Sequence, residues 1–167
     1  MALPSHLRPD CQHCVALCCV APAFDAEQGF GHDKPAGEPC RNLAADHRCS
    51  IHATLVSQGY PACAAFDCFG AGQRVTRQFD GSDWRKSALT AGQMFQTYSR
   101  LRTLHELLAM TMLAQQRATT APAVQKLQQI LAGIEQLCEI EEPIDGVALR
   151  RRTVRNIRDA LSLQGSP

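Results

Sequence analysis

The segment CQHCVALCC, residues 11–19, places four cysteines in one short run and decides how the first half of the chain folds. Four more cysteines follow before residue 70, so eight of the nine cysteines lie in less than half of this 167-residue chain. Too few large apolar residues separate them to close a core, and we therefore expect a ligand of the thiols to hold this region together. The eight residues are Cys11, Cys14, Cys18, Cys19, Cys40, Cys49, Cys63 and Cys68.

These thiols are expected to bind metal and not to form disulfides. Residues 1–14 contain no apolar signal-peptide segment, and no stretch approaches the ~18 apolar residues of a transmembrane helix. A cytoplasmic location without membrane contact is therefore expected, and thiols stay reduced there. An odd number of cysteines and the adjacency of Cys18 and Cys19 also fit a disulfide framework poorly. Thiolate sulfur is a soft ligand that selects zinc, Cu(I) or iron in clusters.

The spacing of the cysteines leaves the metal open between Zn²⁺ and an iron–sulfur cluster. Eight thiols are enough for two four-coordinate zinc sites, for one cluster and one zinc, or for a single site with several free thiols. Only Cys11 and Cys14 have the spacing of a zinc knuckle, whereas Cys63 and Cys68 lie at the outer edge of ligand spacing. The compact run at residues 11–19 is similar to the closely spaced ligands of a cluster.

The adjacent pair suggests that the first run serves more than one purpose. If residues 11–18 are helical, Cys11, Cys14 and Cys18 share one face, and Cys19 points about 100° away from Cys18. One member of the pair then ligates a metal while the other packs or serves a second site.

Several polar residues are placed near the cysteines in sequence. Nearby cations offset the charge of a thiolate site, although the same residues also fit an ordinary charged surface. With so many thiols available, His13 and His52 are expected outside the set of metal ligands. His105 is expected to be a hydrogen-bonded, partly buried residue, and Cys138 a core thiol. The candidate cations are Lys34, Arg41, His47 and Arg48.

The connecting segments carry weaker signals. Residues 20–39 predict a long loop, residues 50–58 a short helix, and residues 70–87 a hinge that begins with a glycine turn. The alternation in VTRQF, residues 75–79, allows one short strand. Trp84, the only tryptophan, is expected to anchor this connector on the rest of the fold.

From residue 88 onward the pattern predicts three amphipathic helices. Thr90 and Gln93 form a capping box for the first, Pro122 begins the second, and Asp145 caps the third, which Gly165 ends. The predicted fold is mainly α: a loop-rich cysteine and metal-binding unit, residues 1–87, packs on a three-helix bundle, residues 88–167. The apolar positions are Met94, Tyr98, Leu101, Leu108 and Met112; Val124, Leu127, Leu131, Ile134 and Cys138; and Val147, Val154, Ile157 and Leu161.

The ordered motifs CxxCxxxCC, PCxNL, DxRCSIH and CxxFxC resemble those of the bacterial YkgJ-type cysteine-cluster proteins, which are described as zinc- or iron-chelating. The resemblance implies that all eight cysteines are metal ligands, and the segment Cys49–His52 matches especially well. The chain departs from the family before Cys63, where SQGYPAC keeps the proline but lacks the usual arginine. Some relatives of the wider group look like iron–sulfur-dependent modifying enzymes, which favours iron slightly.

Residues 63–85 also resemble the N-terminal cysteine region of certain bacterial pentapeptide-repeat proteins. Such repeats are absent from this sequence, so nothing about them carries over.

The sequence allows three functions. A non-catalytic protein would use the metal for structure, sensing or handling. An iron–sulfur enzyme would need an acid–base pair, and the sequence offers none, because Asp67, Asp80 and Asp83 fit turns. An adaptor would bind a protein partner through the helical half. The net charge of +1 gives no argument for nucleic acid, despite a basic patch on the last helix. The patch comprises Arg150, Arg151, Arg152, Arg155 and Arg158.

Overall fold

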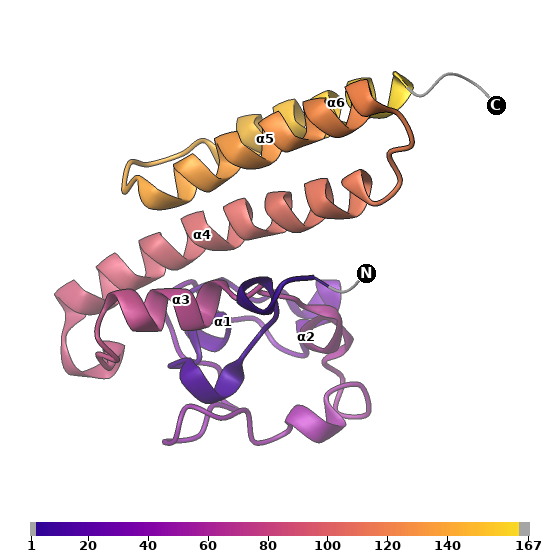
Figure 1. Ribbon diagram of the computed structural model, residues 1–167. Helices are drawn as coiled ribbons and strands as arrows, with labels where there is room; N and C mark the ends of the chain where they lie inside the picture. Colours follow the sequence, from indigo (N-terminus) through magenta and orange to yellow (C-terminus); the bar gives the residue numbers. More distant parts are fainter. Residues whose placement is uncertain (1–2, 164–167) are drawn as a thin grey trace.

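The computed structural model describes residues 3–163, and within that range the chain is mainly helical and contains no strand. Three long helices form an antiparallel bundle on one side, and a loop-rich region covers the other side of the first of them (Figure 1). The predicted mainly α fold is therefore confirmed. The helices are α1 (Leu17–Val20), α2 (Pro61–Ala65), α3 (Ala71–Gln78), α4 (Ala88–Gln115), α5 (Ala121–Glu139) and α6 (Gly146–Ser162).

Short helical turns punctuate the loop-rich region. Asp10 caps the second turn and Asp83 caps the last, each by accepting a hydrogen bond from the backbone N–H two residues later. The turns are η1 (Ser5–Leu7), η2 (Cys11–His13), η3 (Ala26–Phe30), η4 (His52–Thr54) and η5 (Trp84–Lys86).

Helix α4 is the central element because it packs against α5 and α6 on one side and against α3 and η5 on the other. The single apolar stripe expected for it is therefore only part of its buried surface: Leu104 and Leu107 are buried as completely as Leu101. A helix that is covered on several sides must be apolar on several sides. The predicted stripe residues Met94, Tyr98, Leu101 and Leu108 are all buried, while Met112 is partly buried.

The caps of the three long helices agree with two of the three predictions. Asp145 accepts hydrogen bonds from the N–H groups of Val147 and Ala148 and caps α6, as expected, and α5 has Pro122 in its first turn. The capping box of α4 is wrong, because Ser87, three residues earlier than Thr90, caps that helix. Gly165 lies outside the described residues.

The buried face of α6 differs from the predicted one. Val147 is 64% exposed, and the fully buried positions are Leu149, Thr153 and Ala160. They are spaced by four and seven residues, so a small residue and a threonine occupy the face that contacts the bundle. The predicted Val154, Ile157 and Leu161 are partly buried, and the last two pack against the core cluster that contains Ala160, so the prediction fails at Val147 and misses the small and polar residues of the face.

The segment after Gly70 is a helix, so the strand predicted at residues 75–79 is wrong. Val75 and Phe79 are four residues apart, and a five-residue window with apolar ends fits one helical turn as well as a strand. Gly70 begins α3 with a φ of +75°, and a Cβ there would lie 2.1 Å from the carbonyl oxygen of His6. Only glycine fits this turn.

Trp84 fastens the connector to the fold as predicted. Its side chain is 8% exposed, packs 5.9 Å from the ring of Phe95 on α4, and donates a hydrogen bond from Nε1 to the Val15 carbonyl at 2.8 Å. The contact joins three segments: the first cysteine run, η5 and α4.

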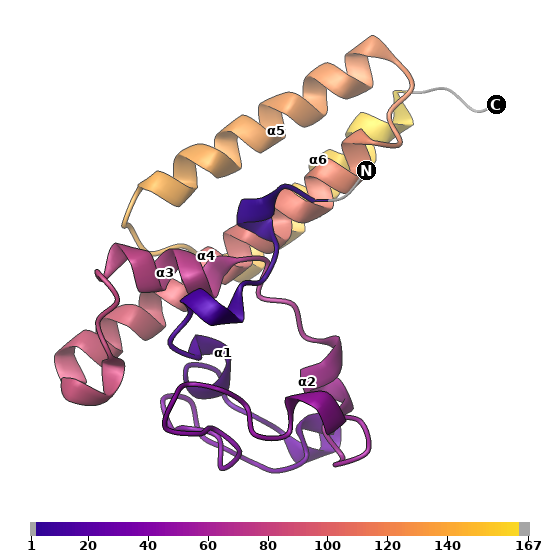
Figure 2. The same cartoon turned by 60° about the horizontal axis from the view of Figure 1, so that its bottom comes forward.

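The cysteine-rich loops are folded by turns more than by helices (Figure 2). The continuous helix considered for residues 11–18 is absent, because Cys14 is extended and Ala16 adopts a left-handed conformation with φ of +58°. Residues 50–58 form only the turn η4 and not a longer helix. Residues 20–39 are a loop as expected, closed by a bridge between Phe24 and Lys34.

Candidate metal centre

All eight clustered cysteines are free thiols in the structure, as is Cys138. Cys11 is exposed, Cys40 is buried, and the other six of the cluster are partly buried. They come from four places: the run at η2 and α1, the loops between α1 and α2, helix α2, and the turn before α3.

One group of cysteines lies against the bundle. Cys14, Cys18 and Cys68 all pack against the main hydrophobic core, which α4 dominates. Burial raises the pKa of Cys11, and the nearby charge of Cys68 raises it further. We call Cys11, Cys14, Cys18 and Cys68 the inner cysteines.

The second group lies in the loop layer away from the bundle and is joined through the backbone. The N–H of Cys40 donates to the carbonyl of Cys19 at 2.9 Å, and Leu43, which forms a bridge with Cys49, donates to the carbonyl of Cys40 at 2.9 Å. Burial, together with the smaller effect of the charges of Cys19, Cys40 and Cys49, raises the pKa of Cys63 to about 11. We call Cys19, Cys40, Cys49 and Cys63 the outer cysteines.

The adjacent pair lies at the boundary between the two groups. Cys18 and Cys19 follow one another in α1, so their side chains diverge, although their sulfurs remain 3.8 Å apart. The hydrogen bond between the two sulfurs raises the pKa of Cys18 and lowers the pKa of Cys19.

Backbone N–H groups face several of the sulfurs. The N–H of Asn42 donates to Cys40 Sγ at 3.4 Å. Burial raises the pKa of Cys14 and of Cys49, but N–H groups of the following residues, Leu17 and Ile51 respectively, oppose this by favouring the thiolate. Amides oriented in this way stabilise the charged form that a metal ligand requires.

Two of the four expected cations, Lys34 and Arg48, are held near the thiols by hydrogen bonds to backbone carbonyls. Lys34 is 5% exposed and donates three hydrogen bonds from Nζ, to the carbonyls of Val20 (3.2 Å), Pro22 (2.6 Å) and Pro35 (3.0 Å). Burial lowers the pKa of Lys34, and the charges of Cys40 and Cys19 oppose that shift.

On the inner side, the guanidinium of Arg48 donates to the carbonyl of Cys11, and its charge favours the thiolate there. The charge of Arg41 likewise lowers the pKa of Cys40, against the larger effect of burial. His47 instead pairs with Asp83 at 3.3 Å.

Three buried side-chain donors lack a partner in the described part of the chain: Nε of Arg102 and two on residues beside the cysteines. The latter two are the hydroxyl of Tyr98 and the side-chain amide nitrogen of Asn42. Tyr98 is 2% exposed, and burial together with the charges of Cys18, Cys68 and Cys14 raises its pKa well above the usual value. A buried donor without an acceptor lowers the stability of the fold. Both positions therefore suggest that a hydrogen-bond acceptor belongs beside them.

Sequence reasoning assigned Tyr98 only to an apolar stripe and did not single out Asn42. Helical periodicity correctly placed the ring of Tyr98 in the core. Only the fold shows that its hydroxyl is buried without a partner, within reach of the charges of Cys14, Cys18 and Cys68.

Within residues 3–163, no three cysteine, histidine, aspartate or glutamate side chains lie close enough together to hold a metal ion as they stand. The structure thus brings the thiols into two neighbourhoods without closing a coordination sphere.

Of the three histidines considered from the sequence, only His105 has a prediction that the structure tests: it is hydrogen-bonded as expected, but fully and not partly buried. His13 is exposed and pairs with Asp10 at 2.7 Å, and His52 is exposed on η4. His105 is 1% exposed and hydrogen-bonds through Nδ1 to the carbonyl of Phe69 at 2.7 Å. Cys138 is buried in the main core, which confirms its assignment as a core thiol.

Burial lowers the pKa of His105 to about 4, so this residue is neutral and donates from Nδ1. Its Nε2 then faces Arg74 at 3.4 Å, and Arg74 in turn donates to the carbonyl of Cys138 at 3.1 Å and to the Glu139 carboxylate at 2.8 Å. This network joins the turn that carries Cys68 to α4 and α5.

A hollow of about 320 Å³ opens beside Cys14. Its lining includes Val15, Asp46, Arg48 and Arg77, and of the inner cysteines only Cys14 lines it.

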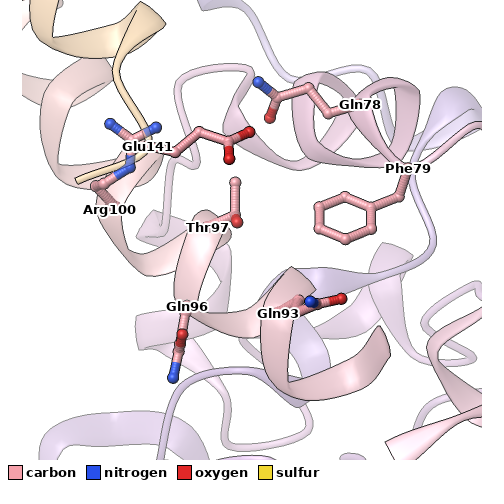
Figure 3. Close-up of a pocket in the computed structure, with 7 residues that line it drawn as sticks. All are labelled: Gln78, Phe79, Gln93, Gln96, Thr97, Arg100 and Glu141. Atoms are coloured by element: carbon pink, nitrogen blue, oxygen red, sulfur yellow. The ribbon is translucent and has the colours of Figure 1, made fainter. Parts of the chain in front are cut away.

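A second hollow, of about 330 Å³, lies between the end of α3, the first half of α4 and the turn after α5 (Figure 3). It is lined by Gln78, Phe79, Gln93, Gln96, Thr97, Arg100 and Glu141, and none of these is a metal-ligand candidate.

The acidic residues and the last helix show no catalytic arrangement. Asp67 accepts a hydrogen bond from the N–H of Phe69, and Asp83 caps η5, which are turn-stabilising roles. Arg150 pairs with Glu106 at 2.5 Å across the bundle. The other four arginines of α6 are exposed.

The chain is 48% identical over 103 residues to a protein of Bacillus subtilis (strain 168) named "Uncharacterized protein YybG". The match covers 61% of this chain and 37% of that relative, so the chain spans well under half of the relative's length. No family model and no solved structure matches the sequence. None of the helices in residues 3–163 combines the length and the apolarity that a membrane crossing requires.

Proposed function

We propose that residues 11–68 bind metal through their eight cysteine thiolates, as Zn²⁺ or an iron–sulfur cluster, in a cytoplasmic protein of the YkgJ type. The observation that carries the proposal is the gathering of eight free thiols in one loop-rich layer, several with backbone N–H groups facing the sulfur. Four thiolates are a complete ligand set for either metal centre.

The buried polar groups around the thiols fit a metal–thiolate centre. The hydroxyl of Tyr98 and the amide of Asn42 are donors that lack an acceptor, and metal-bound thiolates are acceptors. Lys34 supplies a buried positive charge beside Cys19 and Cys40, which offsets the negative charge that four thiolates leave on a divalent metal.

The role proposed for the metal is to fold the cysteine-rich region, with sensing or handling of the metal as uses of the same centre. The main core is shared between the bundle and the segments that carry the inner cysteines, whereas the loops around the outer cysteines add a small aromatic cluster, formed by Phe24, Phe30, His32 and Tyr60. A structural zinc contributes about 10–16 kcal/mol of apparent binding free energy in small domains, which is enough to fold such a region.

Metal analysis of matched cysteine variants tests the proposal. Cys49→Ser should lose bound metal and lower the melting temperature of the cysteine-rich half, whereas Cys138→Ser should retain its metal, because that thiol lies in the bundle core. Both proteins are purified without oxygen and analysed for zinc, iron and sulfide. Equal metal contents in Cys49→Ser and the unchanged protein would contradict the proposal.

A further inference from the structure

We propose that the cysteine-rich region holds two separate four-thiolate metal sites, one formed by the inner cysteines and the other by the outer cysteines. This inference rests on the proposed metal binding and adds to it which thiols share a metal. The inner site is Cys11, Cys14, Cys18 and Cys68; the outer site is Cys19, Cys40, Cys49 and Cys63.

The packing of the thiols supports the division. Cys14, Cys18 and Cys68 lie against the bundle core. Cys19 and Cys40 are joined in the loop layer by a backbone hydrogen bond of 2.9 Å, and the bridge of Leu43 with Cys49 extends this layer. These contacts place three ligands against the bundle core and three in the loops. Cys63 lies within reach of the charges of Cys19, Cys40 and Cys49, and Cys11 within reach of the charge of Cys68 and, more weakly, that of Cys19.

Helix α1 explains how one run of sequence serves both sites. Successive residues of a helix point about 100° apart, so Cys18 turns to the bundle while Cys19 turns to the loops. Adjacent cysteines are unsuited to sharing a small site, but they suit two sites that lie side by side. The two sulfurs lie 3.8 Å apart, about the separation of two thiolates bound to one tetrahedral zinc, so the division requires Cys18 and Cys19 to turn apart when the two metals bind.

Each neighbourhood also has its own donor without an acceptor. The Tyr98 hydroxyl, on α4, is under the influence of Cys18, Cys68 and Cys14, which are all inner cysteines. The Asn42 amide belongs to the residue whose backbone N–H donates to Cys40, an outer cysteine. Arg102 Nε, whose charge acts on Tyr98, is a third unpaired buried donor in the described residues, so these donors agree with acceptors in both groups but do not count the sites.

Pairs of cysteine substitutions distinguish a protein with two metal sites from a protein with one. The reduced, metal-free full chain is titrated with Co²⁺, whose thiolate complexes absorb visible light, and the bound equivalents are counted. The unchanged protein and Cys138→Ser should bind two. Cys14→Ser/Cys68→Ser, within the inner set, and Cys40→Ser/Cys63→Ser, within the outer set, should each bind one.

A pair that crosses the sets is the decisive comparison. Cys14→Ser/Cys40→Ser should bind no cobalt in a four-thiolate environment, although it lacks the same number of thiols as the pairs within a set. Equal cobalt binding by pairs within and across the sets would overturn the division while leaving metal binding intact. Failure of the unchanged protein to bind cobalt through sulfur would instead contradict the proposed function itself.

A measurement on the unchanged sequence guards against variants that fail to fold. The metal-free protein receives one equivalent of Zn²⁺, and its unprotected thiols are then alkylated and mapped by mass spectrometry. Single molecules should show protection of all four inner or all four outer cysteines together. Protection of sets that mix Cys14 or Cys68 with Cys40 or Cys63 would overturn the proposal.

A methyl group added at Gly72 should disturb the inner site without removing a metal ligand. A Cβ at Gly72 would lie 2.6 Å from Cys14 Sγ, whereas one at Gly133, also in a helix, meets nothing within 4 Å. Gly72→Ala should therefore weaken Co²⁺ binding at one site by about tenfold, the lower end of the effect of disturbed ligand orientation, and leave the other unchanged. Gly133→Ala should alter neither, and equal weakening of both sites by Gly72→Ala would contradict the assignment.

Discussion

The two halves of the molecule are held together by different means. In the helical half, α4, α5 and α6 bury long apolar side chains in the main core and in a smaller core formed by Ala114, Leu127 and Ala160. In the cysteine-rich half, turns, a buried lysine and eight thiols take the place of a large core. The comparison teaches that apolar packing holds the helical half throughout, whereas in the cysteine-rich half it reaches only the segments that contact α4, and the outer loops rely on turns and hydrogen bonds.

The halves meet through a few defined contacts. Helix α3 and the turn η5 pack on α4, and the network from Phe69 through His105 and Arg74 to Cys138 crosses the same boundary. The division at residue 87 stays a prediction, because the main core takes residues from both sides of it.

Metal removal should produce the largest difference in stability between the two halves. Treatment with a chelator under reducing conditions removes a contribution of about 10 kcal/mol or more if the metal is structural. We expect residues 11–70 to lose protection from amide hydrogen exchange, while α5 and α6 keep theirs. Unchanged protection of residues 11–70 in metal-free protein would show that the turns alone hold that half.

A cavity beside the central helix α4 should have the next largest effect on stability, and it should weaken the helical half more than the cysteine-rich half. Leu104 is fully buried in the main core, so Leu104→Ala should lower the free energy of unfolding by about 3 kcal/mol. Leu113→Ala, at a 48% exposed position of the same helix, is the matched control and should cost much less. Chemical denaturation followed by circular dichroism measures both, and equal losses would contradict the central place of α4.

The boundary between the halves should respond to pH through His105. The pKa of this residue is lowered from 6.5 to about 4, so between these values the unfolded chain binds more protons than the folded one. The contribution of neutral His105 to the free energy of unfolding is therefore fully present above pH 6.5. It is lost as the pH falls toward 4, and the total loss is about 3 kcal/mol.

The variant His105→Gln isolates this effect, because glutamine keeps a donor for the Phe69 carbonyl but does not titrate. Denaturation at matched metal loading should show a steeper loss of stability between pH 6.5 and 4 in the unchanged protein than in His105→Gln. Parallel pH profiles would show that the histidine is not buried in its neutral form.

The cap of α6 should have the smallest effect. Asp145 accepts hydrogen bonds from two N–H groups of the first turn, and Asp145→Ala should cost about 1 kcal/mol. Metal content should not change, since α6 lies on the side of α4 away from the cysteines (Figure 1). Asp145→Asn, which retains the cap, is the control; a loss of metal in Asp145→Ala alone would link the far helix to the thiols.

The long helices were predictable from the sequence because proline, aspartate and apolar spacing agree over many residues, as at Pro122 and Asp145. The strand predicted around Val75 failed because five residues cannot distinguish the two periods. The eight candidate ligands could be named from composition, and nothing in the structure tests their coordination. Their grouping needed the fold, because the two groups of cysteines and the unpaired hydroxyl of Tyr98 are visible only there.

The most direct test of the central claim is the metal and acid-labile sulfide content of protein purified without oxygen, recorded with its visible spectrum. We predict stoichiometric metal: iron with sulfide and a broad absorption near about 400 nm for a cluster, or zinc in a colourless protein. Two centres per chain would also agree with the division into inner and outer cysteines. Folded protein with eight reactive thiols and no bound metal would contradict the account.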